Sequence, residues 1–93
     1  MSATAMARFP LGRIVATPTA LNSVPNDEIL RAIQRHHAGD WGDVCPEDRG
    51  SNDQSLLDGS RLLSAYHTTA GVKFWIITEW DRSATTILLP EDY

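Results

Sequence analysis

The sequence predicts an α+β domain with a mainly antiparallel sheet of about four strands and helices packed on one face. Most of its aromatic and β-branched residues fall in one block, residues 61–90, which is typical of strands. Short turn signals interrupt this block, and an amphipathic helical pattern precedes it. At 93 residues the chain can enclose a single core. We therefore expect one α+β domain over residues 9–93, after a flexible N-terminus over residues 1–8.

Three strands fit the block, over residues 61–67, 72–80 and 85–89. The first connection ends at Gly71, which can take a positive φ without a Cβ clash. The second contains Asp81, whose side chain can fold back onto the backbone of a turn. Two such short connections imply an antiparallel meander.

The middle strand carries apolar residues on both of its faces, which is the pattern of a central, largely buried strand. We therefore expect Leu63, Trp75, Ile77 and Leu88 to be buried. A sheet this apolar needs a helical layer over it, and the first half of the chain must supply that layer.

An edge strand is expected over residues 11–16, since Pro10 can precede an edge, where its missing N–H is not needed. Thr17 and Pro18 then form a helix start, with threonine as the N-cap and proline at the first helical position. This helix is short because Pro25 follows it closely.

A second helix is expected over residues 26–37, with acidic residues in its first turn and basic ones in its last. Ile29, Leu30 and Ile33 form its apolar stripe. Further on, we expect a separate helical turn over residues 46–48. A short helix capped by Ser51 or Asn52 and ended by Gly59 should follow that turn.

Charge and composition exclude several classes of function. The net charge is −4, with 8 basic against 12 acidic residues, so binding to nucleic acid is not expected. The single cysteine, Cys45, cannot form an internal disulfide. The sequence shows no leader and no apolar run of membrane-spanning length, so a cytoplasmic location without membrane association is expected.

Five possible metal ligands lie close together in sequence: His36, His37, Asp40, Asp43 and Cys45. Their spacing matches no standard zinc pattern, and adjacent histidines on a helix point about 100° apart. Histidines in a last helical turn are better explained by the helix dipole. We therefore expect no metal and no cofactor. A nucleophilic role for Cys45 is also not expected, because no orienting group is evident beside it.

A ribonuclease is the alternative function. The order of strand, helices and three strands is similar to that of the RelE/ParE toxins, an analogy at the level of fold. In such an enzyme Arg61 and Arg82 would hold phosphate, and His67 or Glu79 would act as general acid or base. Tyr93 would stack on a base. The acidic charge of the chain disfavours this interpretation.

A binding surface is predicted at the turn after the middle strand, where Trp80, Asp81 and Arg82 lie between two strands. The alternative without a binding function is a turn with a solvent-exposed Asp81–Arg82 ion pair, which would contribute under about 1 kcal/mol to stability. Trp41 is a further candidate binding residue, although we expect its indole to close over one end of the core.

Four segments carry a resemblance to a known family: LGRIVATPTAL, HHAGDWGDV, RLLSAY and WIITEWDRSATTILLPEDY. They resemble small bacterial proteins of plasmids and other mobile elements, labelled "plasmid-related protein" or "type I restriction endonuclease subunit M". The chain lacks the glycine-rich loop and the Asn/Asp-Pro-Pro-aromatic motif of a DNA-adenine methylase, so the second label does not describe its activity. We expect a non-catalytic accessory protein that binds a protein partner.

Overall fold

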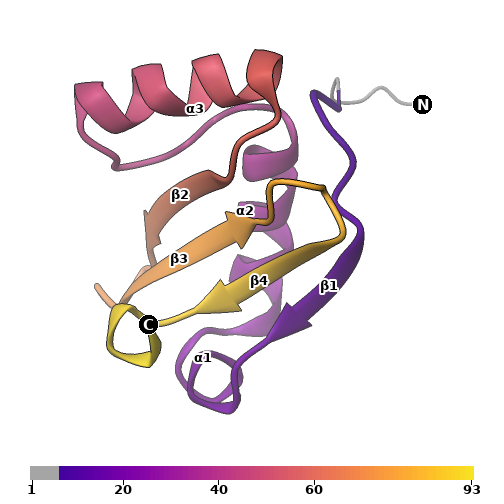
Figure 1. The fold of residues 1–93 in the computed structure, drawn as a ribbon. Coiled ribbons are helices and arrows are strands. Elements are labelled where there is room, and N and C mark those ends of the chain that lie inside the picture. The colour runs from indigo at the N-terminus through magenta and orange to yellow at the C-terminus, as the bar shows by residue number, and fades with distance from the viewer. Residues whose placement is uncertain (1–6) are drawn as a thin grey trace.

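A computed structural model describes residues 7–93 and shows an α+β domain with one four-stranded sheet (Figure 1). The strands are β1 (Arg13–Ala16), β2 (Leu62–His67), β3 (Lys73–Thr78) and β4 (Ala84–Leu88), in the order β1-β4-β3-β2. The pairs β2–β3 and β3–β4 are antiparallel, as the expected meander requires. The sheet is nevertheless mixed, because β1 runs parallel to β4.

The expected flexible N-terminus, residues 1–8, lies outside the described residues except for its last two. Of these, Arg8 donates its backbone N–H to His37 O at 2.9 Å, so the chain is tied to the end of a helix from this residue onward.

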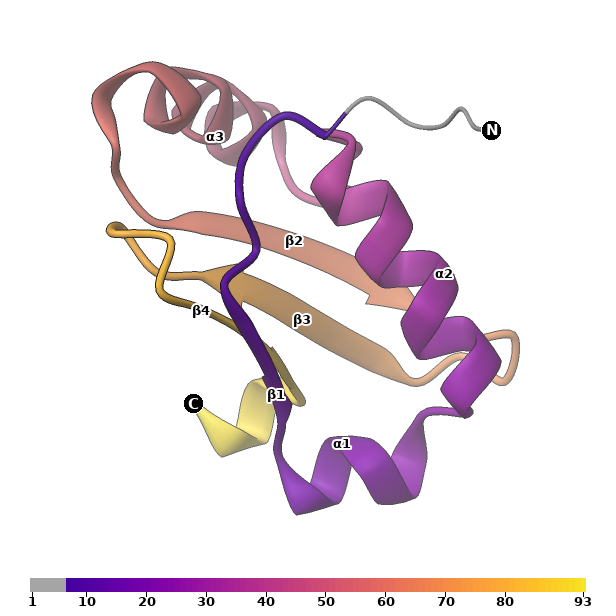
Figure 2. The same ribbon diagram turned by 90° about the vertical axis from the view of Figure 1, so that its right-hand side faces the viewer.

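The helices are α1 (Pro18–Ser23), α2 (Asn26–His37), α3 (Pro46–Asp58) and the short 3-10 turn η1 (Pro90–Asp92). Helix α2 crosses one face of the sheet, whereas α3 lies beyond the outer edge of β2 (Figures 1 and 2). On the opposite face Figure 1 shows no α-helix in front of the strands, only η1.

The first two helices begin as the sequence predicts. The Thr17 hydroxyl accepts a hydrogen bond from Ala20 N at 3.1 Å, with Pro18 at the first helical position. Helix α2 carries Asp27 and Glu28 in its first turn.

Helix α3 corrects a prediction, because it is one continuous helix where a separate turn and a shorter helix were expected. The residues that suggested a break, Gly50, Ser51 and Asn52, lie inside it. Asn52 and Ser55 are buried, so contacts with the rest of the fold override their weak helix propensity. Gly59 ends the helix at φ 78°, as expected.

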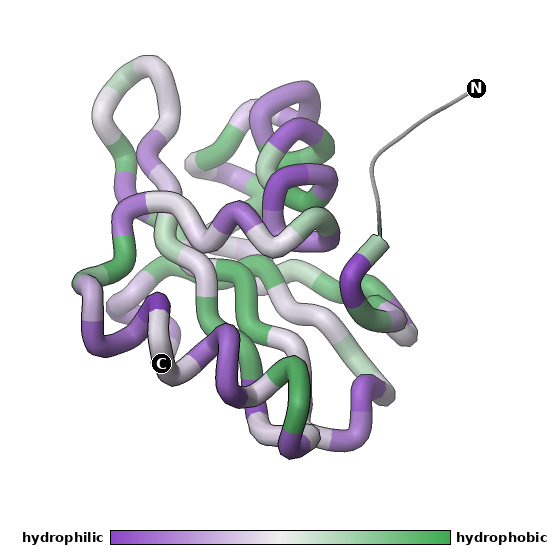
Figure 3. The backbone as a smooth tube through the Cα atoms, turned by 90° about the horizontal axis from the view of Figure 1, so that it is seen from above, coloured by the Kyte–Doolittle hydropathy of each residue, from purple (hydrophilic) through white to green (hydrophobic). Residues whose placement is uncertain are grey.

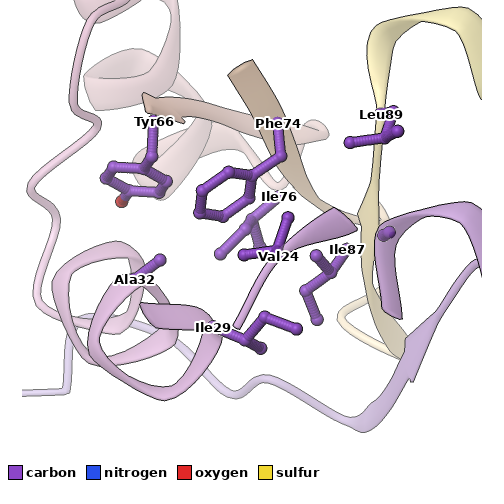
Figure 4. Packing of buried hydrophobic residues seen from close by; sticks show 9 residues of the cluster. Val24, Ile29, Ala32, Tyr66, Phe74, Ile76, Ile87 and Leu89 are labelled. Atoms are coloured by element: carbon purple, nitrogen blue, oxygen red, sulfur yellow. The ribbon is translucent and has the colours of Figure 1, made fainter. Parts of the chain in front are cut away.

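The main core lies between α2 and the sheet (Figure 4). It consists of Ala20, Val24, Ile29, Ala32, Tyr66, Phe74, Ile76, Ile87 and Leu89. A second cluster gathers Phe9, Trp41 and Leu62 near the β2 edge. Figure 3 shows hydrophobic residues along the central strands and mostly hydrophilic ones in the surrounding turns.

Four residues of one sheet face test the predicted burial. Ile77 and Leu88 are each 5% exposed, which confirms their predicted burial. Leu63 and Trp75 are only partly buried, contrary to prediction. All four share the face without an α-helix, because Leu63 pairs with Ile77 and Trp75 with Leu88, so this face is only partly shielded.

Candidate functional site

The residues of the hypothetical ribonuclease are not brought together. Arg61 and His67 lie at opposite ends of β2, which a strand of that length separates by roughly 20 Å. The His67 ring Nδ1 lies 2.7 Å from Asp43 Oδ2, whereas the Arg61 guanidinium lies over the Tyr93 ring. His67 is thus remote from the groups that would hold and stack the substrate. The other candidate general acid or base, Glu79, follows β3 and lies close to the Arg61 end of the sheet.

Arg82 points into the protein and is already occupied. Its Nη1 donates to Ser60 O at 2.6 Å and to Glu79 O at 3.0 Å, and its Nη2 donates to Ser55 O at 3.0 Å. Its backbone has a φ of 60°, and it is the one residue other than glycine with a positive φ in residues 7–93. Arg82 therefore ties the β3–β4 turn to the end of α3, and its guanidinium is not free to hold phosphate.

Asp81 stabilises the same turn. Its Oδ1 accepts a hydrogen bond from Ser83 N at 3.0 Å, as its expected turn role requires. Hydrogen bonds from the Ser83 side chain and backbone lower the pKa of the Asp81 carboxyl. Its partner is thus Ser83, and not the Arg82 of the alternative interpretation.

The two candidate binding tryptophans lie in different surroundings. Trp80 is 66% exposed on the β3–β4 turn, so its indole is available to a partner. Trp41 is 3% exposed, and its Nε1 donates to Asp53 Oδ1 on α3 at 3.1 Å. Trp41 therefore closes one end of the core, the alternative that its sequence context left open.

The clustered histidines and acids of the second helix and its following loop disperse in space. His36 is fully buried, Asp40 pairs with Arg35 at 2.8 Å, and Cys45 is exposed. Across residues 7–93 no group of three His, Cys, Asp or Glu side chains is arranged to hold a metal ion.

His36 belongs to a buried polar chain that crosses the sheet beneath α2. Its Nδ1 lies 2.5 Å from Ser64 Oγ and its Nε2 lies 2.8 Å from Thr78 Oγ1. Thr78 Oγ1 is 2.7 Å from Thr85 Oγ1, whose hydroxyl donates to Leu11 O at 2.6 Å. Because the Thr85 hydroxyl donates its proton to Leu11 O, it must accept from Thr78, and Thr78 must in turn accept from His36 Nε2. The imidazole proton is therefore on Nε2.

The environment of this ring keeps it neutral. Burial, with smaller contributions from the neighbouring His37 and Arg82, lowers the pKa of His36 to about 3. A ring with no access to solvent cannot exchange protons with a substrate, so His36 is a structural residue.

A hollow of about 200 Å³ lies between α2 and the β2–β3 connection. Its charged groups have partners within the protein. Glu28 Oε1 accepts from Thr69 N at 2.8 Å, Arg31 lies 3.8 Å from Asp27, and Arg35 pairs with Asp40. The hollow therefore offers little charge for binding a substrate.

An aromatic cluster lies on the sheet face without an α-helix. The rings of Trp75 and Tyr93 meet edge to face, with centroids 5.8 Å apart. The Arg61 guanidinium lies 5.5 Å from the centroid of the Tyr93 ring, within cation–π range. Tyr93 is 68% exposed, and Leu63 on the same face is partly exposed. These four residues, Arg61, Leu63, Trp75 and Tyr93, are here called the aromatic face.

A groove of about 480 Å³ runs between β1 and α2, on the side of the molecule that Figure 2 presents. This β1 groove is lined by Ile14, Val15, Ala16, Leu21, Asn26, Ile29, Leu30, Ile33 and Ile87.

The β1 groove leaves large apolar side chains in contact with solvent. Ile14, Val15, Leu21 and Leu30 are 48%, 39%, 55% and 62% exposed. Leu30 was expected in the apolar stripe of α2, but Ile29, Ala32 and His36 form the buried side of that helix. Sequence reasoning missed the groove because it placed Leu30 in the apolar stripe of the helix and did not bring the edge strand of Ile14 and Val15 beside it.

Comparison of the chain with protein-family models, with curated proteins and with solved structures finds no match. Among residues 7–93, no helix combines the length and the apolar character that crossing a membrane requires.

Proposed function

We propose that this chain is a small non-catalytic accessory protein that binds a protein partner through the aromatic face. The observation that carries the proposal is the Arg61–Tyr93–Trp75 cluster on the sheet face that no α-helix covers. Tryptophan, tyrosine and arginine are the residue types that dominate binding energy at protein interfaces. The resemblance of the sequence to proteins of plasmids and other mobile elements supports a bacterial accessory role.

The geometry argues against the ribonuclease alternative. Arg82 is engaged by three backbone carbonyls, and His67 lies at the far end of β2 from Arg61, so only Glu79 and Arg61 of the four predicted catalytic groups lie near one another. Phosphoryl transfer needs the cation and the general acid or base around one reacting group. A net charge of −4 also disfavours attraction of RNA.

The test is affinity capture from the cells in which the protein occurs, with the chain as bait. We expect Tyr93→Ala and Arg61→Ala to reduce capture of a specific partner by at least about tenfold, the loss typical of a hot-spot residue. The matched control is Leu57→Ala, because Leu57 is an 83% exposed apolar residue on α3. Circular dichroism verifies that each variant is folded.

Two outcomes would contradict the proposal. One is equal capture by the parent and by both variants of the aromatic face. The other is RNA cleavage by the purified protein that disappears in Arg61→Ala and in either His67→Ala or Glu79→Ala, which would establish the ribonuclease instead.

A further inference from the structure

The outer edge of β1 has backbone groups without a partner strand. Arg13 N donates to Ser83 O and Thr17 N donates to Ile87 O, both at 3.0 Å and both toward β4. Because backbone groups alternate in direction along a strand, the N–H and C=O groups of Ile14 and Ala16 point away from β4. No strand lies outside β1 in the described part of the sheet.

The surface beside this edge is apolar and uncharged. The β1 groove has no charged residue in its lining, and it exposes Ile14, Val15, Leu21 and Leu30. Proteins protect an edge strand by covering it, by a bulge, or by keeping it short and charged. β1 is short, with four residues and one charge, Arg13, but within residues 7–93 no strand pairs with its outer edge and the groove beside it has no charged lining. The surface is therefore suited to receive another strand.

We propose that a second copy of this chain occupies the edge, with the two β1 strands antiparallel around a two-fold axis at Val15. In this register Ile14 lies opposite Ala16 of the other copy, and each such pair exchanges both of its backbone hydrogen bonds. The two sheets then become one continuous sheet, and Val15 of each copy lies directly opposite Val15 of the other.

The distribution of charge favours a second copy as the occupant. Each chain carries a net charge of −4, and the uncharged groove lets two such chains meet without like charges in contact. In the proposed register Arg13 lies opposite Thr17, so the one charged residue of β1 does not meet its own copy.

The inference concerns a surface separate from the aromatic face, so the two can fail independently. Sedimentation should show a monomer–dimer equilibrium in the parent and in Tyr93→Ala alike. A parent that stays monomeric up to about 1 mM, the weak end of specific affinities, would overturn the inference.

Cysteine cross-linking tests the register. Residues at a non-hydrogen-bonded antiparallel pair lie about 4.5 Å apart at Cα, within disulfide reach. In a Cys45→Ser background, Val15→Cys should form a covalent dimer under mild oxidation at least about tenfold faster than Leu57→Cys, since rate follows proximity. Equal rates of dimer formation for the two cysteine variants would refute the register. In a cell extract, cross-linking of Val15→Cys only to a different protein would refute a second copy of this chain as the occupant.

A charge exchange gives the sharpest test. Val15→Lys and Val15→Asp should each be folded monomers, because the axis brings two like charges together. Mixed in equal amounts, they should form a heterodimer that dissociates as salt increases. Dimers that persist in either single variant would show that another surface forms them, and would overturn the inference.

Discussion

The two edges of the sheet are built in opposite ways. Along β2, the Asn52 side chain pairs with both backbone groups of Leu63, through Nδ2 to O at 2.6 Å and from N to Oδ1 at 3.0 Å. Ala65 N donates to Trp41 O at 3.1 Å, and Asp43 N donates to Ala65 O at 2.7 Å. Along β1, the outward groups of Ile14 and Ala16 face an apolar groove.

The covered β2 edge shows that a few residues are enough to satisfy the outer backbone groups of a strand in this fold. The loop after α2 comes so near β2 that a Cβ at Gly42 would lie 2.1 Å from Ala65 O. Gly42 also has a φ of 74°, so no other residue fits there without displacing the backbone. Since no part of residues 7–93 covers β1 in a comparable way, we interpret its edge as an interface.

The largest expected effect concerns the polar chain that links β2 to Leu11, two residues before β1. The pKa of His36 is lowered from 6.5 to about 3, so the unfolded state binds more protons between those values. Stability should therefore be full above pH 6.5 and decline by several kcal/mol as the pH falls toward 3.

Denaturant titrations at pH 7 and pH 4.5 measure this decline. The pKa values of Asp40, Asp81 and Asp92 are lowered from 3.8, so these groups act mainly below that pH. His36→Gln should be less stable than the parent at pH 7 but should lose most of the slope between the two pH values. A slope unchanged in His36→Gln would assign the effect to other groups.

The next effect tests the closed edge. Asn52→Ala leaves the N–H and C=O of Leu63 without partners, and should lower the free energy of unfolding by about 2–4 kcal/mol. Gln54→Ala is the control, because Gln54 is exposed on the same helix and its loss should change stability by less than about 0.5 kcal/mol. Equal melting temperatures for the two variants would mean that the β2 edge needs no cover.

A smaller effect is expected where the β3–β4 turn is tied to α3. Arg82→Ala removes the hydrogen bonds to Ser55 and Ser60 and leaves a positive φ, so it should destabilise by about 2 kcal/mol. Arg82→Gly loses the same bonds but accepts that φ, so it should be the more stable of the two by up to about 1 kcal/mol. Chemical denaturation that ranks them in the reverse order would contradict a left-handed residue 82.

The smallest effect is expected at the open edge. Val15→Lys changes a residue that is 39% exposed, so the folded monomer should lose less than about 0.5 kcal/mol. Thermal melts at low protein concentration, where dimers are absent, measure this value. A loss comparable to that of Asn52→Ala would show that β1 packs within the monomer as closely as β2 does.

The fold was largely predictable because its strongest signals are local. Thr17 and Pro18 start α1, Gly59 ends α3, and Gly71 takes a φ of 91° in the first hairpin connection. Each of these depends on a few neighbouring residues, so the sequence alone reveals it. The division of α3 was wrong because Asn52 is stabilised by Leu63, a residue outside the helix.

The candidate surfaces were less predictable because they depend on distant pairs. Nothing near Arg13 indicates that β1 will run parallel to β4, and only that pairing makes Ile14 and Leu30 walls of one groove. Likewise, the sequence shows Arg82 as a charged turn residue, whereas its direction depends on the carbonyl of Ser55. In the sequence, apolar residues that will be exposed cannot be distinguished from those that will be buried until the strand topology is known.

The parallel pairing of the first strand with the last also bears on how the chain folds. Arg13 aligns with Ala84 and Ala16 with Ile87, so nearly the whole polypeptide lies in the loop that this pairing closes. Closing so long a loop is entropically unfavourable and slow compared with forming the β2–β3 and β3–β4 hairpins. During synthesis, β1 emerges early but must remain unpaired until β4 has left the ribosome. Until then both long edges of β1 are free, so the nascent chain is most vulnerable to aggregation at its first strand.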